Sequence, residues 1–175
     1  MIAGSERLLD SLAHSMDVDP APYILSAVKV LPMPSSLRDN VSSVIKQHCS
    51  KAQNVVFALL IAGNQLITLV RMKKYYIHPA DLHLIFNLVS SSESFKLSES
   101  WTPICLPKFD SRYYIVKCIE KKVVLTCNVF YSSGFMHAHV SYLSEDSPVC
   151  LFMLTVERDI FFDLSEARNK IVNVS

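Results

Sequence analysis

Glycine is scarce in this sequence, and its scarcity excludes one large class of sites. Only three glycines occur in 175 residues. A loop that cradles phosphates with successive backbone N–H groups needs several glycines at short spacing. The sequence therefore holds no nucleotide-binding glycine loop, and it predicts no cofactor.

The chain also lacks an excess of charge of either sign. Lysine and arginine number 17 against 16 aspartates and glutamates, for a formal net charge of +1. Nucleic-acid-binding domains usually carry a clear basic excess, so nucleic acid is not an expected partner.

Paired cysteines are absent as well. The five cysteines are an odd number and show none of the spacings of a metal motif; they are Cys49, Cys105, Cys118, Cys127 and Cys150. A reduced, cytoplasmic protein is the simplest interpretation.

No uninterrupted apolar run is long enough for a membrane segment. The longest tract, from Val55 to Val70, is broken by Gly63 and its polar neighbours, and a bilayer needs about 20 apolar residues. Charged residues from Glu6 onward interrupt the N-terminus, so no signal peptide is expected.

What the chain does contain is apolar periodicity. Ser5 and Asp19 with Pro20 start two predicted helices, the second running to Leu31, and Ser35 or Ser36 caps a third. Residues 1–52 are thus expected to be a helical segment without a sheet of its own.

From residue 54 the pattern changes to that of a small α+β domain. Val55–Ile61 and Gln65–Met72 are predicted strands around a tight turn, and a helix starts at Pro79 after His78. Further strands are expected at Trp101–Leu106, Gly134–Leu143 and Val149–Val156, with a last helix capped by Asp159. The order β-β-α-β-β-β-α is that of a longin-like antiparallel five-stranded sheet with flanking helices.

Several short strings resemble one family. They are GSER (4–7), LP (31–32), FALL (57–60), NQL (64–66), LVR (69–71), HPADLHL (78–84), FNLVSSS (86–92), WTPICLPKF (101–109), GF (134–135) and HAH (137–139). In this order and spacing they closely resemble the Mon/SAND vacuolar-fusion family.

The resemblance implies a fold and a function. Members carry three longin domains and pair with a Ccz-type longin subunit as guanine-nucleotide exchange factor for a late-endosomal Rab GTPase. The expected place of action is the cytoplasmic surface of endosome, lysosome or vacuole membranes, to which the protein attaches peripherally. Residues 1–52 then correspond to the closing helices of a first, truncated longin domain, and residues 53–175 to the second.

The chain departs from the family pattern at residues 112–131. The family passes almost directly from Lys108-Phe109 to Gly134-Phe135, so this stretch is interpreted as an aberrant insertion. A retained intron is the hypothesis, and transcript sequencing across the segment tests it.

Two side-chain groups are candidates for sites. His137 and His139 lie on one face of a predicted strand and suggest a metal site, but a zinc site needs further ligands, and partly buried structural histidines are the favoured interpretation. Arg71, Lys73 and Lys74 form a basic cluster that suits an anionic lipid or a partner's acidic face, although a solvated strand end is the simpler interpretation. Trp101 suits a core anchor and an interface equally well.

No nucleophile or acid–base pair stands in a catalytic arrangement. The sequence therefore predicts a protein-docking module rather than an enzyme. The alternatives are a longin-type trafficking scaffold without exchange activity and, less favoured, a metal-dependent enzyme around the two histidines.

Overall fold

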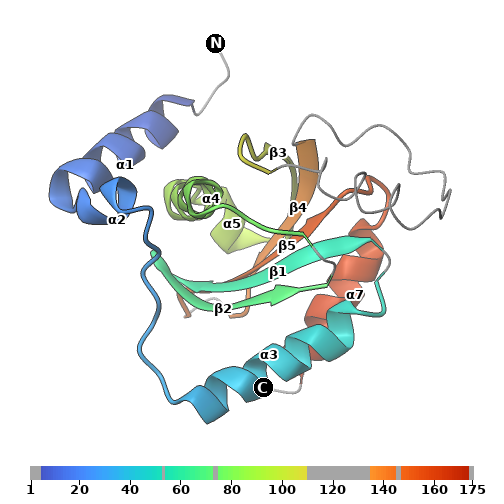
Figure 1. Ribbon diagram of the computed structural model, residues 1–175. Coiled ribbons are helices and arrows are strands. Elements are labelled where there is room, and N and C mark those ends of the chain that lie inside the picture. Colours follow the sequence, from blue (N-terminus) through green and yellow to red (C-terminus); the bar gives the residue numbers. More distant parts are fainter. Residues whose placement is uncertain (1–4, 53, 73–74, 110–134, 145–146, 174–175) are drawn as a thin grey trace, which may run out of the picture.

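The computed structural model describes residues 5–52, 54–72, 75–109, 135–144 and 147–173 (Figure 1). The predicted insertion at 112–131 lies outside the described residues. The elements are α1 (Ser5–Val18), α2 (Ala21–Ile24), α3 (Ser35–Cys49), β1 (Val55–Ala62), β2 (Gln65–Arg71), α4 (Pro79–Ser91), α5 (Ser94–Leu97), β3 (Ser100–Cys105), β4 (Phe135–Tyr142), β5 (Val149–Thr155) and α7 (Phe161–Val172).

The strands form one antiparallel sheet in the order β2-β1-β5-β4-β3. This confirms the predicted α+β class and the five-stranded sheet. β1 and β2 meet in a hairpin whose first turn residue, Gly63, has a φ of +57°, a conformation that glycine adopts without strain.

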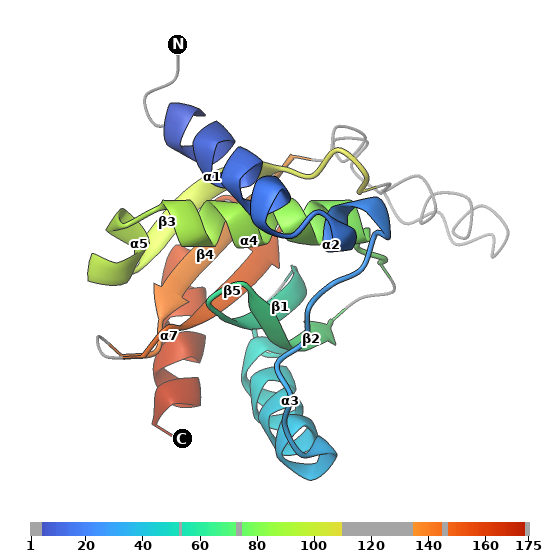
Figure 2. The same cartoon turned by 90° about the vertical axis from the view of Figure 1, so that its left-hand side faces the viewer.

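One face of the sheet is covered by α4. This helix begins as predicted: His78 accepts a hydrogen bond from the Ala80 N–H at 3.1 Å, and Pro79 follows. Ile85 and Phe86 bury themselves against Phe57 and Phe152 of the central strands, in the larger of two apolar clusters. α1 lies on the outer side of α4, away from the sheet (Figures 1 and 2).

α3 and α7 cover the opposite face (Figure 1). Ile45 and Cys49 of α3 and Leu164 of α7 are buried in the second apolar cluster, with Leu60 and Leu151 of the sheet. With both faces covered, β1 is buried from Val55 to Ile61, as its continuous apolar sequence predicts.

The prediction of a second helix reaching Leu31 is wrong. α2 ends at Ile24, and Ser26 has a φ of +50°, which breaks the helix. The following residues run along the outer edge of β2, where the Leu66 N–H donates to Lys29 O and the Leu31 N–H donates to Leu66 O, both at 2.9 Å. Backbone groups of an edge strand need partners, and this extended segment supplies them.

Arg38 of α3 also binds the outer edge of β2 and the segment paired with it. Its guanidinium donates to the carbonyl oxygens of Ile67 and Leu31, each at 2.7 Å. A planar guanidinium suits two acceptors at once, so this residue joins α3, the extended segment and β2.

Smaller differences concern the ends of elements. Residues 94–97, between the predicted helix and the strand at Trp101–Leu106, form the short helix α5. Ile160, not Asp159, occupies the N-cap of α7, and no side chain caps it. Among the described residues, no helix has the length and apolar character needed to cross a membrane.

Candidate functional site

The two predicted histidines lie in a cluster between the β3–β4 side of the sheet and α7. We call it the histidine cluster; it consists of Glu99, Trp101, His137, His139, Phe161 and Arg168. His137 stacks on Trp101 with ring centroids 5.5 Å apart and an interplanar angle of 16°, because the two residues sit on neighbouring strands. His139 and Trp101 both contact the ring of Phe161 at the start of α7.

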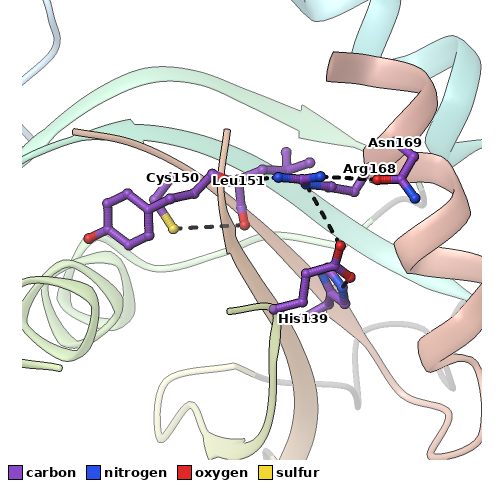
Figure 3. Close-up of polar contacts among 7 residues, drawn as sticks. His139, Cys150, Leu151, Arg168 and Asn169 are labelled. Atoms are coloured by element: carbon purple, nitrogen blue, oxygen red, sulfur yellow. Dashed lines mark hydrogen bonds and ion pairs between the residues drawn. The ribbon is translucent and has the colours of Figure 1, made fainter. Parts of the chain in front are cut away.

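Glu99 connects the cluster electrostatically. His139 Nε2 lies 3.0 Å from one carboxylate oxygen of Glu99, and Arg168 Nε lies 3.8 Å from the other. Arg168 also donates to Tyr142 O at 3.0 Å and to Asn169 Oδ1 at 3.0 Å, and Figure 3 shows it extending from α7 over the strands. The network joins α7 to β4 and to the residue that precedes β3.

Burial decides the protonation of His139, and hydrogen bonds decide that of Glu99. His139 is fully buried, and burial lowers its pKa despite the opposing effect of Glu99. Burial by itself raises the pKa of Glu99, but hydrogen bonds from Ser165 and His139 and the charge of Arg168 outweigh it, so this pKa is lowered. At neutral pH a neutral His139 therefore donates its Nε2–H to an ionised Glu99.

This arrangement does not assemble a metal site. Within the part of the chain that the structure describes, no three residues among histidine, cysteine, aspartate and glutamate come together to hold an ion. The Nε2 of His139 is already hydrogen-bonded to Glu99. Among the described residues, its Nδ1 is buried without a hydrogen-bond partner. His137 and His139 do share one face of β4, as predicted, but their neighbours are the rings of Trp101 and Phe161 and the single carboxylate of Glu99.

The lowered pKa of His139 predicts a dependence of stability on pH. Unfolding restores its ordinary pKa near 6.5, so the unfolded state binds the extra proton below that pH, and stability falls as the pH drops through 6.5. We expect His139 to contribute a loss of about 1 kcal/mol in the free energy of unfolding between pH 7.5 and 5.5. Urea titrations at both pH values measure it.

His139→Gln is the matching variant for this prediction. It keeps a donor toward Glu99 but cannot titrate, so the difference between the two pH values should shrink. If the variant loses as much stability as the parent protein when the pH falls from 7.5 to 5.5, His139 is not the group responsible. His137, whose pKa burial and Arg158 also lower, accounts for part of what remains.

Neither buried thiol is a nucleophile. Burial raises the pKa of Cys49 and of Cys150 to about 12, so both stay protonated near neutral pH. Cys105 is exposed on the edge strand β3, and Cys118 and Cys127 lie outside the described residues.

The basic cluster is described only in part. Arg71 is exposed at the end of β2, opposite Phe57 on β1, whereas Lys73 and Lys74 lie outside the described residues. Beyond them Tyr75 packs on Phe109 with centroids 5.4 Å apart, and Tyr76 is exposed. The described part is a solvent-facing basic and aromatic strand end.

Sequence reasoning missed the residues that organise the histidine cluster. Glu99 and Arg168 lie 69 positions apart, and no periodicity connects them. Asn87 stands in one of the family-like strings, and its Nδ2 donates to Leu8 O at 2.8 Å, which holds α1 on α4. The signal available was a lone amide among the apolar positions of α4.

The described residues line two hollows that contain charged side chains. One, of about 500 Å³, lies between the end of α3 and α7, where Lys51 and Lys170 face Asp163 and Glu166. The other, of about 180 Å³, lies between α1, α2 and α4 and contains the Asp19–Lys29 ion pair. Their charges are largely compensated, so neither selects an ion of one sign.

Comparison with known proteins gives consistent matches. The family model described as "Second Longin domain of FUZ, MON1 and HPS1" matches residues 53–127 and 115–173. The chain is 43% identical over 170 residues to vacuolar fusion protein MON1 homolog A of Gallus gallus. This alignment covers 97% of the chain and 27% of the chicken protein. It is 43% identical over 172 residues to protein SAND of Takifugu rubripes, covering 98% and 28%, and 32% identical over 171 residues to vacuolar fusion protein MON1 homolog of Arabidopsis thaliana, covering 98% and 24%. The chain spans about a quarter of the length of these relatives.

Proposed function

The chain belongs to the family of second longin domains of FUZ, MON1 and HPS1, and within it to the Mon1/SAND vacuolar fusion proteins; on this premise we propose that it acts in membrane trafficking as part of a guanine-nucleotide exchange complex. The GTPase is a late-endosomal Rab, and the pairing subunit is a Ccz-type longin protein. The work takes place peripherally on endosome, lysosome or vacuole membranes, in the steps that lead to fusion.

The observation that carries the proposal is the combination of fold and similarity. A longin sheet covered on both faces leaves the outer sides of its helices for docking, and the similarity to vacuolar fusion proteins extends over nearly the whole chain. Nucleotide exchange needs no covalent chemistry: it needs surfaces that bind the nucleotide-free GTPase better than the loaded one. The histidine cluster, in which His139 and Arg168 pair with Glu99 and the other neighbours are aromatic rings, is compatible with that role.

Within this function the chain supplies a docking domain rather than the exchange surface. By the family resemblance, exchange belongs to the first longin domain, and residues 1–52 are the helices that close it. Arg71, Lys73 and Lys74 contribute a contact to anionic lipid or to the acidic face of a partner.

Co-purification with a Ccz-type subunit tests the assignment. The tagged 175-residue chain is expressed together with that subunit, and a stoichiometric complex is expected. Absence of binding would remove the assignment to this complex. The chain alone should leave the rate of GDP release from the Rab unchanged.

A second experiment distinguishes a subunit of an exchange complex from a trafficking scaffold without exchange activity. The aligned segment of the chicken MON1 homolog A is replaced with this chain, and the chimera is combined with the Ccz-type subunit and the Rab loaded with fluorescent GDP. We expect release to accelerate by at least about tenfold, about 1.4 kcal/mol. A complex that forms but leaves release unchanged would favour the trafficking scaffold without exchange activity.

A further inference from the structure

The chain ahead of α3 passes around one edge of the sheet. α1 and α2 lie on the side of α4, α3 lies on the opposite face, and residues 25–34 connect the two sides past β2 (Figure 2). We call residues 5–33 the arm, and their extended part, residues 28–33, the strap. Among the side chains that the structure describes, the first buried one along the chain is Ile45 of α3, so the arm lies on the domain without entering its core. Elements with little buried surface open at a low cost in free energy.

Two backbone hydrogen bonds pair the strap with β2 in the described part of the chain. Both involve Leu66: its N–H donates to Lys29 O, and its carbonyl oxygen accepts from the Leu31 N–H, each at 2.9 Å. Pro32 follows directly and has no N–H, so the pairing ends there. The strap therefore covers the outer edge of β2 as a very short parallel strand.

The strap also places side chains on both sides of the sheet edge. Val28 packs against the apolar cluster between α4 and the sheet, whereas Leu31 and Met33 pack against the cluster between α3 and the sheet. Residues an odd number of positions apart on an extended chain point to opposite sides, so the spacing explains this arrangement. Arg38 completes the contact by donating to the carbonyl oxygens of Leu31 and Ile67. Ile67 is skipped in the β1–β2 register, as the extra residue of a β-bulge is.

The closed position of the arm has unfavourable features. Ser26 holds a φ of +50°, a conformation that is strained for a residue with a side chain. Two atoms of α4 beside the arm, His83 Nε2 and Asn87 Oδ1, are buried without a hydrogen-bond partner among the described residues. Opening of the arm lets water reach both atoms, which offsets part of the contacts that are lost. These features favour a cover that opens over a permanent sixth strand.

We propose that the arm is a displaceable cover, and that the outer edge of β2 binds an extended segment of a partner protein in place of the strap. The strap defines the chemistry of that segment. It runs parallel to β2, places one apolar side chain on the α4 side and two more, three and five residues later, on the α3 side, and presents a carbonyl oxygen to Arg38. Addition of a strand to a sheet edge is a common mode of peptide recognition.

The strap is thus an internal competitor, and the partner binds only the open form. A second copy of this chain offers the same strap without the advantage of being tethered to the site, so it does not displace the internal one. The occupant is therefore a different protein. This inference is independent of the proposed exchange complex.

Competition with a strap peptide tests the proposal. A fluorescein-labelled peptide of residues 26–34 is titrated with the 175-residue chain, and binding is followed by fluorescence anisotropy. Leu31→Ser in the chain weakens the strap but leaves the edge of β2 unchanged, so we expect it to raise the apparent affinity for the peptide about tenfold. Val30→Ser is the matched control: Val30 is 46% exposed in the same segment, and its substitution should change the affinity less than about twofold. A peptide that carries both Val28→Ser and Leu31→Ser should not bind.

A reversible cross-link holds the arm closed. Val30 and Leu66 pair across the strap and β2, close enough for a disulfide when both are replaced by cysteine. Oxidation of the Val30→Cys, Leu66→Cys chain should lower peptide binding at least about tenfold relative to the same chain when reduced. The Val30→Cys chain should bind equally before and after oxidation. Undiminished binding to the cross-linked chain would overturn the proposal, and so would absence of binding to a Leu31→Ser chain whose near-UV circular dichroism matches the parent.

Hydrogen exchange measures the opening without substitutions. The Leu31 amide is hydrogen-bonded, yet it should exchange at least about a hundredfold faster than the Leu59 amide of the central strand, because the arm opens without unfolding of the sheet. Equal protection would mean that the arm opens only with the whole domain, against the proposal. A dimer that grows with concentration and excludes the peptide would assign the edge to a second copy instead. None of these experiments contains the Ccz-type subunit or the Rab, so failure of the exchange-complex assignment is a separate result.

Discussion

Ile45→Ala is expected to lower the free energy of unfolding of the chain by about 2–5 kcal/mol, the range for large-to-small substitutions at buried positions. Ile45 is 1% exposed on the inner side of α3, in the cluster that also holds Leu60 and Leu151 of the sheet. Truncation removes apolar contacts on the helix and on the strands at once and leaves a cavity. Urea or thermal unfolding measures the loss.

Leu37→Ala is the matched control on the same helix. Its side chain is 49% exposed, so its removal should cost less than about 1 kcal/mol. Equal losses for the two variants would mean that α3 does not pack on the sheet in solution as it does here.

The result bears on where the folding unit begins. The family model matches from residue 53, and residues 35–49 lie ahead of it. Yet α3 contacts β1, β2 and α7, and its Arg38 holds the edge of β2. If Ile45→Ala destabilises the whole chain in one transition, α3 is part of this domain's core.

The central hairpin and α4 were predictable because local and tertiary preferences agree there. A continuous apolar run, a glycine turn and a histidine–proline start each favour the structure that burial also favours. The helix prediction for the segment after α2 is wrong although its apolar spacing suits a helix. Its backbone instead forms hydrogen bonds with Leu66 at the outer edge of β2. Such long-range pairing leaves no trace in a local pattern.

The candidate site was predictable only in its strand part. Two histidines at alternate positions of a strand share a face by geometry alone, and they do so on β4. Their partners come from elsewhere: Trp101 through strand pairing, and Phe161 and Arg168 through the packing of α7. Whether a histidine pair serves a metal or a core depends on those partners, so the sequence could favour structural histidines but could not name the residues around them.

Glu99→Ala is expected to cost about 2–3 kcal/mol of stability. Removing one member of a buried charged pair typically costs about 3–5 kcal/mol, and we place this case lower because the side chains of Glu99 and Arg168 are each 23% exposed and retain some water. The loss arises because Arg168 keeps its charge without an anion, and the buried Nε2–H of His139 keeps no acceptor. The measurement is urea unfolding at pH 7.5.

Glu93→Ala isolates the role of burial in that prediction. Glu93 pairs with Lys96 at 3.1 Å, but its side chain is 72% exposed, so its removal should change stability by less than about 0.5 kcal/mol. Combining Glu99→Ala with His139→Ala should recover about 1 kcal/mol relative to the sum of the single losses, because the unmet donor disappears together with its acceptor. Strictly additive losses, or a loss at Glu99 as small as that at Glu93, would mean that the histidine cluster is held by its aromatic contacts alone.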